Sequence, residues 1–107
     1  MSASIVQCSC PDAESASRIA HALIEARLAA CVQALGGVSS TYRWNEAVTV
    51  STEVLLLIKT RRERLEAVRD CVLALHPYEL PEIVAVDIAS GHPPYLDWIA
   101  RETAAPA

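Results

Sequence analysis

Apolar and polar residues repeat with two periods along this chain, and these periods predict alternating strands and helices. Residues 5–10 alternate as a short strand that Pro11 stops. Asp12 is a suitable N-cap for a helix that follows. The helix is predicted from apolar residues at helical spacing, namely Ala16, Ile19, Ala20, Leu23, Ile24 and Leu28.

The middle of the chain predicts two long strands. The first covers residues 31–44 and bends at Gly36-Gly37, and a turn at residues 45–47 joins it to a second strand over residues 48–59. At about 3.3 Å per residue the second strand spans roughly 40 Å, which is more than a domain of this size needs. The excess predicts a protruding hairpin arm. Its free edges need a partner, and self-association would supply one.

The C-terminal part predicts a helix, a strand and a second, short helix. Thr60 and Glu63 have the spacing of a capping box, with Thr60 as the N-cap, and Pro77 ends the helix that follows. Residues 83–88 form the strand, and we expect the tail from Thr103 to fray. The last helix carries Tyr95, Leu96, Trp98 and Ile99.

The resulting order, β-α-β-β-α-β-α, is typical of one α/β domain with a ferredoxin-like fold, an α+β sandwich to which a C-terminal helix is added. No linker or internal repeat divides residues 1–107, and the core extends from about residue 5 to residue 102. In this pattern four strands carry two helices on one face. The pattern alone supports this fold class.

Composition excludes several classes of protein. Of the 107 residues, 52% are hydrophobic and 21% are charged, which excludes a disordered chain. The net charge of −4 provides no basic field for nucleic acid, and no apolar run is long enough to cross a membrane. No targeting segment precedes the first strand, so we expect a cytoplasmic protein.

The four cysteines, Cys8, Cys10, Cys31 and Cys71, do not predict disulfides in a reducing compartment. The Cys-x-Cys spacing of Cys8 and Cys10 is not the CxxC spacing of redox sites, and no second cysteine pair completes a zinc site. Cys31 and Cys71 lie in apolar segments and are expected in the core.

Several strings, in matching order and spacing, resemble the CutA family from about Ile5 to Glu102. They are ARLAACV (26–32), STYRW (40–44), EVLLLIKT (53–60), HPYELPEI (76–83) and YLDWI (95–99). The resemblance implies a homotrimer held by pairing of the long hairpin arms. It also implies a link to tolerance of divalent cations, copper in particular, without a defined molecular activity.

The resemblance further implies a copper site. Its cysteine, which precedes the Pro-Asp at the start of the first helix, falls on Cys8, and one of its two histidines falls on His76. Leu75 occupies the second histidine position. Cys10 lies on the same strand face as Cys8 and could supply a third ligand to copper or another divalent cation. The alternative is a half-buried thiol and a histidine that caps a helix end.

Polar residues in apolar or aromatic surroundings form a second candidate site. We expect Lys59 and Glu82 to lie close together, walled by aromatic residues, in a cleft between subunits. This cluster is either an ion pair that holds the trimer in register or a site for a small anionic or metabolite ligand. The full set is Lys59, Glu82, Tyr78, Trp44, Tyr42, Asp97 and Trp98.

No catalytic motif is present: GxSxG, HExxH and a phosphate-binding glycine loop are all missing. We therefore expect a protein that is not an enzyme. The leading hypothesis is a trimeric binding or regulatory protein for divalent metal ions. The alternatives are a signal-transduction trimer that binds a metabolite between subunits, and a structural trimer that anchors partner proteins not yet identified.

Overall fold

The structure of the protein is a computed structural model that describes residues 2–105. It confirms the predicted order of elements and adds η1, one turn of 3₁₀ helix at Arg62–Arg64. The elements are β1 (Ala3–Cys10), α1 (Ala13–Glu25), β2 (Cys31–Trp44), β3 (Ala47–Arg61), α2 (Leu65–Leu75), β4 (Val84–Asp87) and α3 (Pro93–Glu102).

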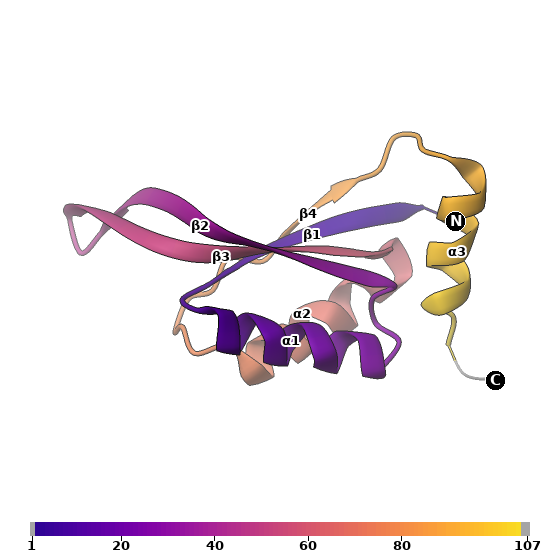
Figure 1. Ribbon diagram of the computed structural model, residues 1–107, viewed down its shortest axis with the longest axis horizontal. Helices are drawn as coiled ribbons and strands as arrows, with labels where there is room; N and C mark the ends of the chain where they lie inside the picture. The colour runs from indigo at the N-terminus through magenta and orange to yellow at the C-terminus, as the bar shows by residue number, and fades with distance from the viewer. Residues whose placement is uncertain (1, 106–107) are drawn as a thin grey trace.

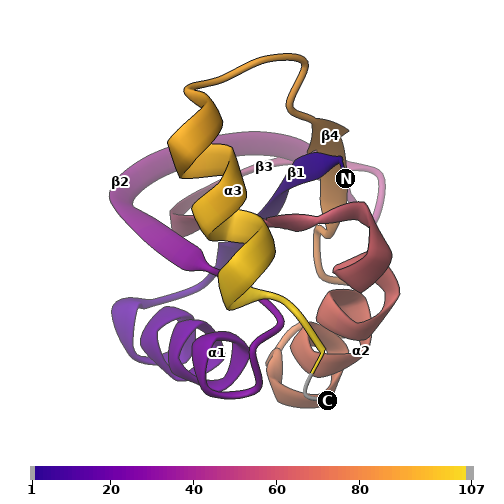
Figure 2. The same cartoon turned by 90° about the vertical axis from the view of Figure 1, so that its right-hand side faces the viewer.

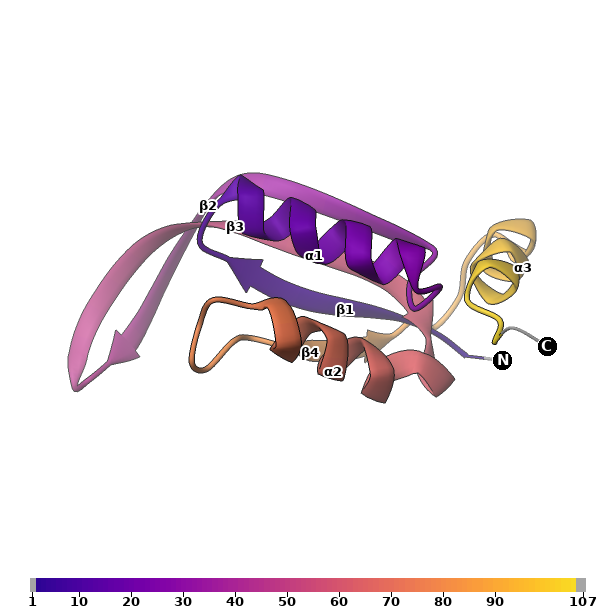
Figure 3. The ribbon, with the colours of Figure 1, turned by 90° about the horizontal axis from the view of Figure 1, so that it is seen from below.

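The four strands form one antiparallel sheet in the order β2-β3-β1-β4. Helices α1 and α2 lie side by side against one face of this sheet (Figure 3), and α3 lies at the end of the sheet opposite the hairpin arm (Figures 1 and 2). The predicted ferredoxin-like α/β fold with an extra C-terminal helix is therefore confirmed. Among residues 2–105, no helix is long and apolar enough to cross a membrane.

The core lies between the sheet and the two helices that cover it. Alternate residues of β1 and β3 point toward the helices, and the apolar stripes of α1 and α2 pack onto them. Burial of these apolar side chains is the main stabilising term of the domain. The residues that form this core are Val6, Cys8, Cys10, Ala16, Ile19, Leu23, Ala29, Leu56, Ile58, Val68 and Val72.

The hairpin arm extends beyond the end of β1. The last pair between β1 and β3 joins Cys10 to Val54. In the arm, residues 38–53, β2 and β3 therefore pair only with each other. A two-residue turn at Asn45 and Glu46, both with positive φ, joins them, as is typical of tight hairpins. The arm gives the molecule its elongated shape of 46 × 27 × 21 Å (Figure 1).

Thr60 is not the N-cap that the capping-box spacing predicted. β3 continues to Arg61, so the backbone at Thr60 is extended, and its hydroxyl donates a hydrogen bond of 2.7 Å to the carbonyl of Leu28. The register between β1 and β3 determines where β3 ends. Because Ala3 pairs with Arg61, β3 includes residues that the local pattern assigned to the helix.

Two other boundaries differ from the prediction. α1 ends at Glu25, before Leu28, because Arg27 has a left-handed φ of 58°. The tail does not begin to fray at Thr103, which is fully buried. Its carbonyl accepts hydrogen bonds from Arg61 at 3.1 Å and from Arg64 at 2.8 Å.

Candidate functional site

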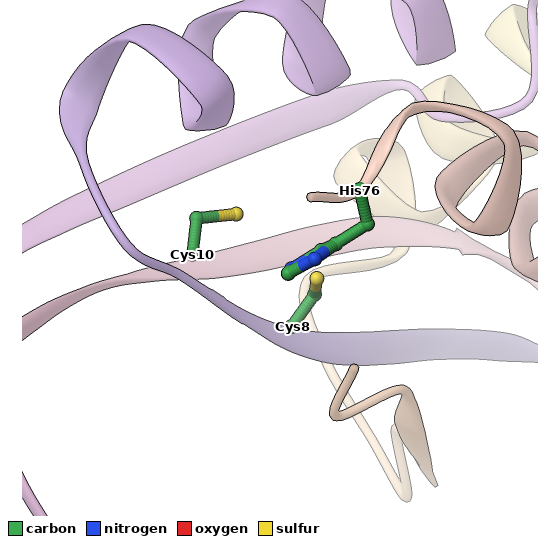
Figure 4. A group of neighbouring side chains, drawn as sticks. All are labelled: Cys8, Cys10 and His76. Carbon is green, nitrogen blue, oxygen red and sulfur yellow. The ribbon is translucent and has the colours of Figure 1, made fainter. Parts of the chain in front are cut away.

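Two thiols and one imidazole meet beneath the sheet where the arm begins. Cys8 and Cys10 point the same way from β1 because residues two apart share a strand face. His76 follows α2 directly, in an extended conformation before Pro77. Their ligand atoms all lie within 4.8 Å of one another, and all three residues are buried (Figure 4).

Both ring nitrogens of His76 have hydrogen-bond partners. Nδ1 accepts from the backbone N–H of Tyr78 at 3.0 Å, and Nε2 lies 2.8 Å from the carbonyl oxygen of Ser9. A carbonyl only accepts, so Nε2 carries the proton and the ring is the neutral tautomer. A metal ion at this ring must therefore replace one of these two hydrogen bonds.

The two thiols differ in acidity. The hydrogen bond between the sulfurs and then burial hold the pKa of Cys8 well above its ordinary value, and the carboxylates of Glu82 and Glu53 act in the same direction. The same hydrogen bond lowers the pKa of Cys10, although burial opposes this. Cys10 is therefore the more acidic thiol of the pair.

In donor chemistry the three residues fit a copper ion, because thiolate sulfur and imidazole nitrogen are ligands that copper prefers. Binding would release thiol protons, so its affinity would rise with pH. Leu75, in the second histidine position, is the last residue of α2 and packs against the core. Cys10 is the third donor present in this cluster.

A cavity of about 740 Å³ opens between the arm and the loop that follows His76. It contains four residues of the predicted ligand cleft, which come from the arm strand β2 and from the loop before β4. Its lining residues are Ser9, Ser40, Thr41, Tyr42, Trp44, Ser51, Glu53, Tyr78, Glu79, Leu80 and Glu82.

Glu53 is a residue of this cavity that sequence reasoning did not select. It is only 6% exposed, and its Oε2 accepts a hydrogen bond of 2.8 Å from the Tyr78 hydroxyl. Burial, and then this hydrogen bond, raise the pKa of Tyr78, so the phenol remains a donor. The available signal was a carboxylate directly before the apolar run 54–58, where an acidic side chain needs a specific partner.

Lys59 and Glu82 are not neighbours within the chain, so the expected proximity is wrong for a single subunit. Lys59 pairs with Ile5 near the start of β1, whereas Glu82 accepts a hydrogen bond of 3.3 Å from Ser9 near the end of β1. Because β3 runs antiparallel to β1, the last residues of β3 lie beside the start of β1. They are therefore far from the loop before β4, which contacts the end of β1.

The rest of the predicted cluster forms a separate group with α3. Lys59 Nζ donates to the Tyr95 hydroxyl at 3.3 Å and lies 5.4 Å from the centre of the Tyr95 ring. The Tyr95 ring in turn stacks on Trp98 with 5.5 Å between centroids. Asp97 is exposed on the same helix. The structure therefore divides the predicted set between two ends of the sheet.

Comparisons with known proteins agree with this fold. The family model described as "CutA1 divalent ion tolerance protein" matches residues 4–102. The divalent-cation tolerance protein CutA of Thermus thermophilus is 46% identical over 92% of this chain and 96% of its own length. The crystal structure of CutA from Xylella fastidiosa superimposes with a TM-score of 0.93 at 43% identity, covering 95% of this chain and 98% of that one.

A third relative is longer. Protein CutA, chloroplastic, of Arabidopsis thaliana is 36% identical over 92% of this chain, which spans 54% of that protein. The chain thus matches about half of this plant relative and nearly all of the bacterial one. With the matched strands, helices and arm, these likenesses show that the chain belongs to the CutA1 divalent ion tolerance protein family.

Proposed function

We propose that this protein is a non-catalytic metal-binding protein of divalent-cation tolerance, which holds copper at Cys8, Cys10 and His76. The observation that carries the proposal is the cluster itself: three ligand atoms of suitable chemistry lie within 4.8 Å in a buried site. The names of the relatives, which refer to divalent ions, support a metal as the ligand. A cytoplasmic location would keep both thiols reduced.

The proposal includes a homotrimer. Helices α1 and α2 cover one face of the sheet in the described part of the chain, and large apolar side chains remain exposed on β2, on the arm strand β3 and on β4. Burying such a surface against identical chains would remove it from water. Three subunits is the number that the family resemblance implies. The exposed residues concerned are Leu35, Val48, Val50, Val84 and Val86.

Copper titration of a double variant tests the metal site. Loss of a residue that only hydrogen-bonds to a metal ligand lowers metal affinity by about 10- to 100-fold. The substitutions Cys8→Ser and His76→Ala together are therefore expected to weaken copper binding by at least about tenfold, measured by calorimetry under reducing and oxidising conditions.

The matched control for this titration is Cys31→Ser with His21→Ala, which removes the same two residue types outside the cluster. Cys31 is half-buried on β2 and His21 is exposed on α1. Equal copper affinity in the native protein and in the Cys8/His76 variant would exclude the site. Cys10→Ser alone is expected to weaken binding if Cys10 takes the place of the missing second histidine.

A second candidate function is binding of a small molecule in the cavity beside the arm. A volume of about 740 Å³ with a few polar groups on apolar and aromatic walls is typical of ligand sites. Thermal-shift screening against nucleotides, carboxylates, amines and sugars tests this function. A flat response to all four classes at millimolar ligand would exclude it.

A further inference from the structure

The cavity between the arm and the loop 76–82 is lined by three carboxylates and by no cationic side chain of the described residues. Its acidic residues are Glu53, Glu79 and Glu82, and its aromatic residues are Tyr42, Trp44 and Tyr78. We propose that this cavity binds an aliphatic di- or polyamine. The proposal rests on the second function above, small-molecule binding in the cavity, and names the class of ligand.

Glu53 points to a cationic ligand. The residue is more than nine-tenths buried, and a buried carboxylate is costly unless it is paired. The Tyr78 hydroxyl donates to Oε2. No protein group among residues 2–105 donates to Oε1, and this atom is not sealed from solvent, so it is open to a ligand in the cavity. An ammonium group at Oε1 would donate a charge-assisted hydrogen bond and supply the opposite charge.

The aromatic walls favour an organic ammonium ion. Tyr42 and Trp44 project from the same face of β2, because they are two residues apart, and both belong to the cavity lining. The Tyr42 hydroxyl is held 2.7 Å from Ser51 Oγ, which restricts its orientation. Ammonium groups bind to the faces of such rings, and methylene groups pack against them.

A single metal ion does not fit the carboxylates as well. Within residues 2–105, the one group of three metal-ligating side chains with atoms close enough to share an ion is Cys8, Cys10 and His76. Glu53, Glu79 and Glu82 do not converge in this way. Carboxylates that are spread over a cavity of about 740 Å³ suit an extended ligand with more than one positive charge.

Trp44 provides a direct probe. In a Trp98→Phe background it is the single tryptophan of the chain, because the sequence has two. Titration with spermidine and with 1,4-diaminobutane is expected to change its fluorescence with saturation. 1,4-Butanediol, which has the same length without charge, is expected to have no effect.

Variants of the carboxylates locate the ligand. Glu53→Gln keeps an acceptor for Tyr78 but removes the charge, and it is expected to weaken spermidine binding by about tenfold or more, as for loss of one charged hydrogen bond. Glu82→Gln is expected to weaken binding less, because Glu82 is exposed. Glu63→Gln in η1 is the matched control and is expected to leave affinity unchanged. Thermal unfolding of each variant checks that it folds.

Equal response to the diol and the diamine, or unchanged spermidine affinity in both Glu53→Gln and Glu82→Gln, would overturn the proposal. If a ligand of another class binds in the thermal-shift screen while amines do not, the amine is excluded and the cavity function remains. If no class binds, both fail.

Discussion

At the scale of single residues, Thr60 shows how tertiary contacts can change the role of a side chain. Its sequence context is that of a helix cap, yet it lies fully buried in β3 and donates to the Leu28 carbonyl in the loop after α1. The hydrogen bond fastens that loop to the sheet. A buried carbonyl left without a donor costs free energy, so this contact has a measurable consequence.

Replacing Thr60 with valine, which has nearly the same shape, is expected to lower the free energy of unfolding by about 1–3 kcal/mol, since the Leu28 carbonyl loses its donor. Urea denaturation followed by circular dichroism measures the change. Thr52→Val is the matched control, because Thr52 is exposed on the same strand. Similar midpoints for the two variants would show that the buried hydrogen bond contributes little.

The metal cluster adds a second lesson at this scale. Cys8, Cys10 and His76 are the residues that sequence reasoning selected, and they lie together in the structure. Their metal-binding role stays a prediction. In the structure the two ring nitrogens of His76 already contact Ser9 and Tyr78. A ligand would compete with those contacts, which makes the copper titration informative.

At the scale of elements, the hairpin arm depends on one glycine. The register between β2 and β3 shifts between Leu35 and Val38, and Gly37 within this bulge has φ of 72°. Left-handed backbone of this kind is open to glycine but costs other residues free energy. The bulge bends the arm where it leaves the sheet, beside Glu53.

Gly37→Ala is expected to destabilise the protein by about 1–2 kcal/mol because alanine at positive φ is strained. No atom outside the adjacent residues lies within 4 Å of a Cβ placed at Gly36 or Gly37, so a methyl group fits at both positions. The two glycines differ in backbone conformation, because only Gly37 has a positive φ. Gly36→Ala is therefore the matched control, and it is expected to keep native stability. Thermal denaturation compares the two, and equal melting temperatures would contradict the role given to Gly37.

At the scale of the whole molecule, the arm exposes more apolar surface than a lone chain needs. Val48 and Val50 are 69% and 65% exposed on one face of β3. Isolated exposed apolar residues are common, but a row of them on a projecting hairpin is typical of an interface. The proposed homotrimer would cover this row.

Light scattering with size-exclusion chromatography tests the assembly. The native chain of 11.6 kDa is expected to elute with about three times that mass. Val48→Asp with Val50→Asp is expected to yield monomers, because two carboxylates in an apolar interface would be desolvated. Leu73→Asp changes an exposed apolar residue on α2 and serves as control. A native monomer at micromolar concentration would exclude the trimer.

Local patterns predicted most of the fold, because the periods of strands and helices are properties of neighbouring residues. The order of elements, the overlong strand and the end of α2 shortly before Pro77 all follow from such patterns. Boundaries were less well predicted where long-range pairing intervenes. The extension of β3 past Thr60 depends on its register with β1, which no local pattern contains.

By itself the sequence determined the types and order of the elements, the shared face of Cys8 and Cys10, and the presence of an overlong hairpin. These depend on the period of the backbone and on the balance of apolar and polar residues. Only the tertiary structure decided which distant residues meet. It placed Glu53 with Tyr78 and Lys59 with Tyr95, and it separated Lys59 from Glu82. The physical reason is that strand order and register, rather than distance along the chain, determine which ends of a sheet lie together.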